Sequence, residues 1–208
     1  MSSITVKWLG HSCFKLTCGN AGIVIDPYDK VEGYPELKAE ANMVLTSHDH
    51  GDHGYVQAVG ITTYNGEFPF EVKRVMSFHD DCGGEKRGKN VIHVITSGGL
   101  EIVHLGDLGH RLSKEQLEKI GKCDLLLVPV GGFFTIDAQM AKTVCDDIKP
   151  RVIIPMHYRR GSLGFDKIAE VEDFTCLYPQ GFVRMLDTDT FELTEDTEPQ
   201  VAVLTFKG

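Results

Sequence analysis

The sequence predicts an α+β protein in which two β-sheets pack face to face and helices cover the outside. Short runs of β-branched and aliphatic residues dominate the chain, and Gly, Pro and Asn turns separate them. Two longer segments with helix-capping residues interrupt these runs in the second half. Runs of strands followed by helices, then by further strands and helices, are typical of packed sheets with external helices.

The first half of the chain is interpreted as a series of short strands. Each is a run of apolar or β-branched residues that stops at a turn-forming residue. Between them we expect a polar loop over 28–40, long enough to be functional, and a short helix over 55–59. The predicted strands span residues 4–8, 13–17, 22–26, 43–46, 62–64, 68–71 and 73–78.

Capping signals locate two helices in the second half of the chain. Ser113 begins the first, Gln116 completes a capping box, and Gly121 is placed to end it. The second helix spans 136–148, with Asp137 in its first turn. A third, short helix is expected near 166–172, and strands over 90–97, 100–105, 124–130, 152–156, 182–186, 191–194 and 201–206, the first two forming a hairpin.

Length and composition favour one soluble domain spanning 1–208. Hydrophobic residues make up 42% and charged residues 25%, as in ordinary globular proteins. No apolar run is long enough to cross a bilayer, and the N-terminus lacks a signal-peptide pattern, so we expect a cytoplasmic protein without a membrane partner. The six cysteines form no C-x-x-C pair and are expected to be free thiols; Cys82 is interpreted as a packing residue rather than a nucleophile.

The formal net charge of −9 bears on the partners of the protein. No dense Lys/Arg run is present, whereas proteins that grip nucleic acid through many phosphates carry a basic face. We therefore expect no nucleic-acid partner. Two divalent cations would bring the net charge to −5 (−9 + 4) and focus positive charge in a pocket, which favours a small anionic or polar substrate. The oligomeric state is left open.

The stretch T-S-H-D-H-G-D-H over 46–53 carries the strongest chemical signal. His48, His50, Asp52 and His53 follow the apolar run 43–45 directly. Imidazole and carboxylate groups are good ligands for borderline divalent metals. A polar loop that is rich in histidine by chance suits a lone histidine, but not four ligand-type residues at this spacing. The stretch predicts a metal site.

Ligand-type residues also follow three later apolar runs. His79 follows 75–78, Asp107 follows the run ending at Gly106, and His157 follows 152–156. Strand ends gathered at one edge of a sandwich can converge, and loops there carry function. Seven candidate ligands suffice for two metals about 3.5–4 Å apart with a water between them.

In this order and context, the cluster over 48–53, then His79, the Gly106–Asp107 pair and His157, resemble the ordered motifs of the metallo-β-lactamase superfamily. The resemblance extends from the W-L-G-H-S run over 8–12 through V-I-D-P over 24–27 to P-M-H-Y over 155–158. It is strongest to small metal-dependent hydrolases related to the ascorbate-phosphate lactonase-like branch. It implies the αββα sandwich, two mixed sheets between helices.

The resemblance also implies the ligand sets. One metal would be held by His48, His50 and His79. The other would be held by Asp52, His53 and His157, with Asp107 bridging both. The metals are expected to be two Zn²⁺, and Mn²⁺ or Fe²⁺ would also fit this donor set. Di-iron redox members place a carboxylate where this chain has His50, so hydrolysis is favoured over oxygen chemistry.

The expected activity is hydrolysis of a small-molecule ester or lactone by a metal-bridging water or hydroxide, with Asp52 also orienting the nucleophile. No Ser or Cys nucleophile is required. Two alternatives stay open. One is a phosphodiesterase acting on a small nucleotide or lipid headgroup, and the other is a non-catalytic metal- or ligand-binding module.

Four further residues have two interpretations each. Asp26 either accepts the second N–H of a ligand histidine or forms a turn before proline. His11 is either an outer contact of the site or a structural turn residue. His110 either protonates the leaving group and binds substrate or lies at the surface. Tyr158 either donates to a developing anion or packs in the core. His93 and His104 are expected to have ordinary roles in the sheet.

Overall fold

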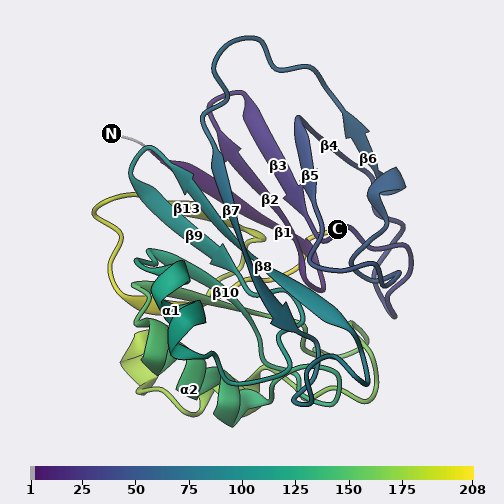
Figure 1. Cartoon of the computed structure of the whole chain (residues 1–208), viewed down its shortest axis with the longest axis vertical. Coiled ribbons are helices and arrows are strands. Elements are labelled where there is room, and N and C mark those ends of the chain that lie inside the picture. The colour runs from purple at the N-terminus through teal and green to yellow at the C-terminus, as the bar shows by residue number, and fades with distance from the viewer. Residues whose placement is uncertain (1–2) are drawn as a thin grey trace.

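Two mixed β-sheets face each other in the computed structural model, which describes residues 3–208. Figure 1 shows the N-terminal strands on one side and the later strands on the other, with helices at the outside of the second sheet. The predicted α+β fold class, with two mixed sheets packed together, is confirmed.

The first sheet has five strands in the order β13-β1-β2-β3-β5. All neighbours are antiparallel except β3 and β5, which run parallel. Along β1 buried and half-buried residues alternate, because successive side chains point to opposite faces of a sheet. The strands are β1 (Ile4–Gly10), β2 (Cys13–Cys18), β3 (Ala21–Ile25), β5 (Met43–Leu45) and β13 (Thr190–Leu193).

The second sheet has seven strands in the order β12-β14-β11-β10-β9-β8-β7. Its central strands β10 and β11 run parallel and are buried at every position, as expected for strands covered on both faces. The strands are β7 (Glu71–Phe78), β8 (Lys89–Ser97), β9 (Leu100–His104), β10 (Leu125–Pro129), β11 (Val152–Met156), β12 (Val183–Met185) and β14 (Gln200–Val203).

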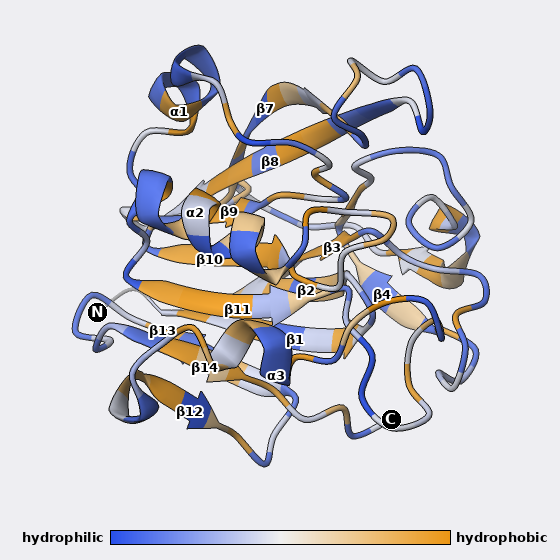
Figure 2. Ribbon diagram, turned by 90° about the horizontal axis from the view of Figure 1, so that it is seen from below, coloured by the Kyte–Doolittle hydropathy of each residue, from blue (hydrophilic) through white to orange (hydrophobic). Residues whose placement is uncertain are grey.

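The helices among residues 3–208 are α1 (Lys114–Ile120), α2 (Ala138–Ile148) and α3 (Glu172–Thr175), with 3-10 turns at Val56–Ala58 and Gln180–Phe182. The predicted capping box of α1 is present, with Ser113 accepting from the Gln116 backbone and Gly121 at the C-cap. Helix α2 packs on β10 (Figure 2). Asp137 is its N-cap and not a first-turn residue, because its side chain accepts from the Met140 N–H at 2.8 Å. No helix within this described range is long and apolar enough to cross a membrane.

A loop and a small parallel sheet cover the outer face of the five-stranded sheet, where no α-helix lies among the described residues. This sheet pairs β4 (Ala39–Ala41) with β6 (Val59–Ile61). Val24 of β3 packs outward against Tyr28, Val31 and Val59 there, while its neighbours in β3 face the main core. The loop over 26–38, which overlaps the polar loop expected over 28–40, is therefore anchored by buried side chains.

Three local predictions were wrong. The strand expected over 62–64 lies earlier, at β6, because its backbone pairs with β4, which lies 20 residues away in sequence. The strand expected over 68–71 is absent, and β7 runs unbroken from Glu71 to Phe78. The helix expected over 166–172 is displaced to α3, since the Ala169 N–H donates to the Gly131 carbonyl instead of to a helix.

Candidate metal centre

The ends of four strands deliver the predicted ligands to one place. The loop after β5 carries His48, His50, Asp52 and His53, and His79 follows β7 directly. Two more ligands come from the seven-stranded sheet, with Asp107 after β9 and His157 after β11. The site therefore lies at the edge of the sandwich where the ends of these four strands come together. This is the position expected from the ligand-type residues that follow the apolar runs.

Two groups of ligand atoms form within this site, and a third group, His48, His53 and Asp107, overlaps with both of them. The first contains His48, His50 and His79, and the second contains Asp52, His53, His157 and, in addition, His11. Within each group the ligand atoms lie within 4.8 Å of one another. The three imidazole rings of the first group have centroids 4.6 to 5.2 Å apart.

Asp107 lies between the two groups. Its Oδ2 is 3.1 Å from His79 Nε2 in the first group and 3.3 Å from His157 Nε2 in the second. Its Oδ1 is 3.1 Å from His53 Nε2. One carboxylate thus faces histidines from both groups, which is the arrangement that a bridging ligand needs.

The buried carboxylate of Asp26 orients His53 directly and His48 through Ser47. Its Oδ2 lies 2.8 Å from His53 Nδ1 and accepts from the Ser47 hydroxyl at 2.7 Å, while Oδ1 accepts from the Ser47 N–H. Ser47 Oγ is also 2.9 Å from His48 Nδ1. Carboxylates that accept the second ring N–H of a ligand histidine set its orientation and tautomer. The position of Asp26 therefore leaves Nε2 of His53 free to face the centre.

A close backbone approach joins the ligand loops of the two sheets. Gly106 has φ 57°, and a Cβ there would lie 2.5 Å from the Ser47 side chain, so only glycine fits. The buried Asn90 side chain accepts from the Asp107 N–H at 2.9 Å and donates to the Leu105 carbonyl. These contacts set the turn that presents Asp107.

Buried polar atoms without a hydrogen-bond partner are concentrated in this site. Among the described residues they include His48 Nε2, His53 Nε2, His157 Nε2 and Asp107 Oδ1. Burying such groups unpaired costs about 1–3 kcal/mol each. Divalent cations at the two ligand groups would satisfy these atoms, so the donor set fits the metals that the sequence predicts.

The charge states of His48 and Asp107 suit cations. Burial, together with nearby His53, lowers the pKa of His48 to about 4, so its imidazole is neutral at pH 7 and offers a lone pair. Burial alone would raise the pKa of Asp107, but His157 and His53 outweigh it and hold that pKa well below its usual range. Neutral imidazoles and ionised carboxylates are the forms that bind metal. Burial alone would lower the pKa of His53, but the carboxylates of Asp107 and Asp26 raise it, so this ring gives up a proton when it binds metal.

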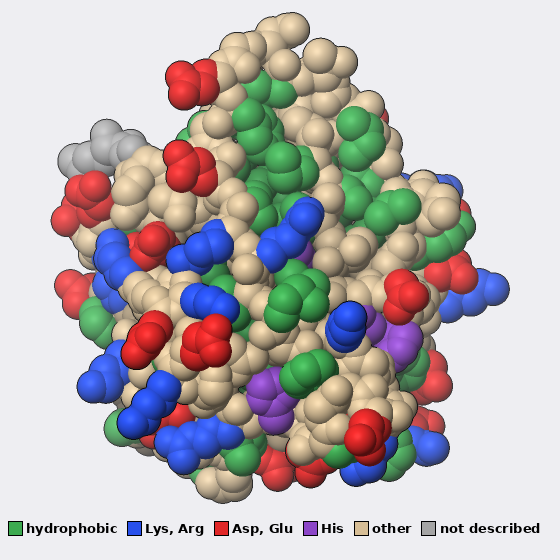
Figure 3. Space-filling view, viewed as in Figure 1, with side chains coloured by type: hydrophobic (Ala, Val, Ile, Leu, Met, Phe, Trp, Pro, Cys, Tyr) green, Lys and Arg blue, Asp and Glu red, His purple; other side chains and the backbone are tan. Residues whose placement is uncertain are grey.

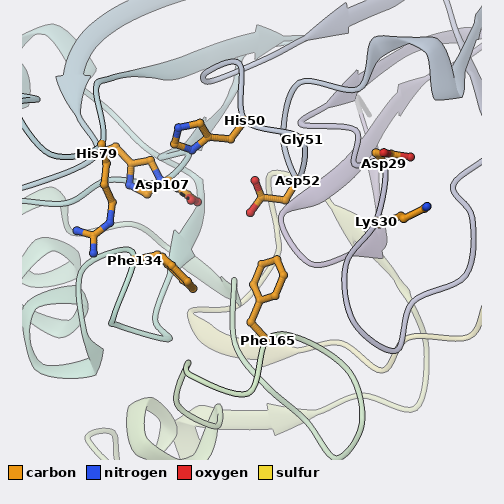
Figure 4. A pocket seen from close by; sticks show the side chains of 10 residues that line it. Asp29, Lys30, His50, Gly51, Asp52, His79, Asp107, Phe134 and Phe165 are labelled. Atoms are coloured by element: carbon orange, nitrogen blue, oxygen red, sulfur yellow. Dashed lines mark ion pairs between the residues drawn. The ribbon is translucent and has the colours of Figure 1, made fainter.

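A pocket of about 440 Å³ is lined by four of the candidate ligands, His50, Asp52, His79 and Asp107. Figure 4 shows Phe134 and Phe165 facing His50, Asp52 and Asp107 across it, with Asp29 and Lys30 to one side, beyond Asp52. The two phenylalanine rings are 5.8 Å apart. The pocket also includes Arg87, whose guanidinium lies 5.9 Å from the Phe134 ring centroid and donates to the Phe133 carbonyl.

His110 and Tyr158 lie elsewhere. His110 lines two neighbouring depressions rather than this pocket, and its Nε2 accepts from the Phe78 N–H at 3.2 Å. Tyr158 is buried, with its ring 5.7 Å from that of Trp8. Neither side chain lines the space above the ligands. The structure therefore has Tyr158 in the core and the half-buried His110 beside the neighbouring depressions.

Sequence reasoning missed four residues that shape the site, Ser47, Asn90, Asp80 and Arg87. Ser47 and Asn90 orient ligands, as described above. Asp80, next to His79, accepts from the backbone N–H groups of the loop that follows, including that of Arg87 at 2.8 Å. The signals in the sequence were weak. Asn90 is a polar amide at the beginning of an apolar strand, and Asp80 precedes the glycine pair at 83–84.

Comparison with known proteins identifies the family of the chain. A family model described as the beta-lactamase superfamily domain matches residues 5–157. A protein of Thermococcus onnurineus named UPF0173 metal-dependent hydrolase is 31% identical over 192 residues, covering 74% of this chain and 84% of that protein. The crystal structure of a Thermotoga maritima protein, described as a candidate Zn-dependent hydrolase of the metallo-β-lactamase superfamily, is 35% identical with a TM-score of 0.75. The match covers 97% of this chain and 98% of that one. A Parabacteroides distasonis structure, 19% identical with a TM-score of 0.65 over 98% and 93% of the two chains, shares the fold.

The chain therefore belongs to the metallo-β-lactamase superfamily, as the ordered motifs indicated. Within that superfamily it is a metal-dependent hydrolase.

Proposed function

We propose that the protein is a dinuclear hydrolase that cleaves a small anionic ester or lactone. The observation that carries this proposal is the position of Asp107, which faces histidines of both ligand groups at 3.1 to 3.3 Å on the floor of a pocket. A single-metal site needs only one of these groups. Five imidazoles and two carboxylates suit two Zn²⁺ ions, and Mn²⁺ or Fe²⁺ fit as well.

When bound, such a metal pair makes a water acidic enough to act as a nucleophile near neutral pH and polarises the oxygen under attack. The protein supplies the orientation. Asp107 and the histidines fix the centre, while Asp52, half-buried at the pocket wall, offers a carboxylate oxygen that accepts a hydrogen bond from the attacking water. Burial alone would raise the pKa of Asp52, but His11 and His53 hold it below its ordinary value, so Asp52 is charged at pH 7.

The pocket wall supports a small substrate with a negative charge. Phe134 and Phe165 provide an apolar surface, Arg87 and Lys30 provide cations, and Asp29 beside Lys30 adds a negative charge. None of the ion pairs found among residues 3–208 involves either cation. A pocket of about 440 Å³ is within the range of small-molecule sites.

A long polyanion suits the surface less well. On the face shown in Figure 3, lysine and arginine side chains are interspersed with aspartate and glutamate and form no continuous basic stripe. The net charge of −9 points the same way. We therefore propose a small molecule, and not a nucleic acid, as the substrate.

The test is turnover by protein loaded with ZnCl₂ or MnCl₂ against a panel of esters, lactones and chromogenic bis-phosphodiesters. We expect hydrolysis of a carboxylate-bearing lactone or ester that chelation abolishes and that Asp107→Ala loses by at least a thousandfold. Asp49→Ala is the matched control, because Asp49 is an exposed aspartate in the same loop and belongs to neither ligand group. Exclusive turnover of bis-phosphodiesters would replace the ester assignment with phosphodiester hydrolysis. Binding of these compounds without any turnover would contradict the proposal that the protein hydrolyses them.

A further inference from the structure

His11 reaches the site from a part of the chain that supplies none of the ligands implied by the family motifs. It lies in the turn between β1 and β2 of the five-stranded sheet. Its side chain is fully buried, and neither ring nitrogen has a hydrogen-bond partner in the described part of the chain. A buried imidazole left unpaired on both sides is rare in folded proteins, so the ring requires an explanation.

The ring lies against the second ligand group. His11 Nε2 is 3.5 Å from Asp52 Oδ2, and its ring centroid is 4.2 Å from that of His157. The ligand atoms of His11, Asp52, His53 and His157 all lie within 4.8 Å of one another. A separation of 3.5 Å is too long for a good hydrogen bond between His11 and Asp52, but it suits two donors that share one ion.

The backbone of His11 is held so that the ring points to this position. Its φ is 51°, in the left-handed region that non-glycine residues seldom adopt. The His11 carbonyl accepts from Trp8 Nε1 at 2.9 Å and from the His157 N–H at 3.4 Å. Strained backbone held by its surroundings is concentrated at functional sites. A turn residue with only a structural role would not need a ring that is buried among metal ligands.

We propose that His11 is a direct ligand of the second metal. This inference rests on the dinuclear centre proposed above. The second position then has four protein ligands of its own besides Asp107, whereas the first has three histidines. The two positions are therefore unequal. With a solvent ligand, the second position is suited to an ion that accepts six ligands, such as Mn²⁺ or Fe²⁺, more than to four-coordinate Zn²⁺.

The test begins with a crystal structure of the wild-type protein loaded with MnCl₂, and a second one loaded with ZnCl₂. We expect His11 Nε2 within about 2.0–2.3 Å of the second ion in the Mn²⁺ form. A distance above about 3 Å in both forms would overturn the proposal and reduce His11 to an outer contact. This readout is needed because outer contacts also weaken metal binding, by about 10–100-fold.

Calorimetric titration of His11→Asn with MnCl₂ supplies the second readout. Asparagine tolerates positive φ, so the turn is preserved, but its side chain is too short to replace the imidazole. We expect one ion to bind as in the wild type and the other at least a hundredfold more weakly. Asp49→Asn, a change at an exposed residue of the ligand loop that belongs to none of the ligand groups, is the control and should match the wild type. Unchanged binding of both ions by His11→Asn would overturn the proposal.

The two proposals fail in different ways. If the wild-type protein binds two ions and His11 stays out of reach of both, only the His11 assignment is lost. If the wild-type protein binds a single ion, the dinuclear centre and the His11 assignment are both wrong.

Discussion

At the scale of single residues, Asp26 shows how one buried carboxylate organises a site without being a ligand. It contacts His53 directly and His48 through Ser47, so it orients one histidine of each ligand group. Burial alone would raise the pKa of Asp26, but His53, His104 and Ser47 outweigh it and lower the pKa to about 2. Asp26 is therefore charged at neutral pH.

Replacing Asp26 tests this role. Asp26→Asn keeps the shape and tolerates the φ of 51°, but it removes the charge that makes the His53 imidazole a stronger donor to metal. We expect metal affinity to fall about 10–100-fold, measured by titration calorimetry. Asp49→Asn is the control. An Asp26→Asn protein that binds metal like the wild type would show that His53 needs no such support.

Arg87 is expected to decide which substrates are accepted. Its guanidinium lines the pocket beside Phe134, and losing a hydrogen bond to a charged group costs about 1.5–3 kcal/mol. Arg87→Ala should therefore lower kcat/KM about 10–100-fold for a carboxylate-bearing ester and leave that for the neutral methyl analogue nearly unchanged. Arg184→Ala, on the distant strand β12, is the control. Equal losses for both substrates would contradict a role in charge recognition.

At the scale of elements, the loop over 80–88 shows how the end of a strand becomes a pocket wall. Asp80 accepts from the backbone N–H groups of Cys82, Gly84, Lys86 and Arg87. The loop is thus folded around one carboxylate immediately after the ligand His79. The loop follows the end of β7 and holds Arg87 in position at the pocket.

Asp80→Ala should release this loop. We expect amide hydrogen exchange over residues 82–88 to accelerate at least tenfold and the preference for anionic esters to fall, because Arg87 is no longer held. Exchange in the core strands β10 and β11 serves as the internal control. Unchanged exchange over 82–88 would show that the loop is held by other contacts.

Helix α1 offers a purely structural test away from the site. Ser113→Ala removes the N-cap that accepts from the Gln116 N–H and should cost about 1 kcal/mol of unfolding free energy. For a chain of this size that corresponds to a fall in Tm of about 2–4 °C, measured by calorimetry. Metal content should not change. A loss of metal in this variant would mean that the helix contributes to the site.

The elements that the sequence predicted best are those with local signals. The capping box of α1 and the strands before each ligand depend on neighbouring residues only, and both were confirmed. The errors at 62–64 and 166–172 occurred where backbone groups pair with distant segments, β4 and the Gly131 carbonyl. Asn90 and Arg87 were missed for the same reason, because their partners are far away in sequence.

At the scale of the whole molecule, the centre joins the two sheets. The strands of the five-stranded sheet supply His11 and the ligands over 48–53, and the seven-stranded sheet supplies His79, Asp107 and His157. The candidate ligands therefore come from opposite layers of the sandwich. Bound cations are therefore expected to cross-link the two layers.

Metal removal should consequently destabilise the protein as a whole. A ligand at 100 times its Kd stabilises the folded state by about 2.7 kcal/mol. Dialysis against EDTA should therefore lower Tm by about 5–10 °C, and added ZnCl₂ should restore it. The Asp107→Ala protein provides the comparison, since its Tm should respond little to EDTA. Identical Tm values for metal-free and metal-loaded wild type would contradict a cross-linking role.

The central claim is that Asp107 bridges two cations, and elemental analysis of the freshly purified protein tests it most directly. We predict close to two ions per chain in the wild type and Asp49→Ala proteins, and a loss of metal in Asp107→Ala. One ion per chain in the wild type, or full metal content in Asp107→Ala, would contradict the claim.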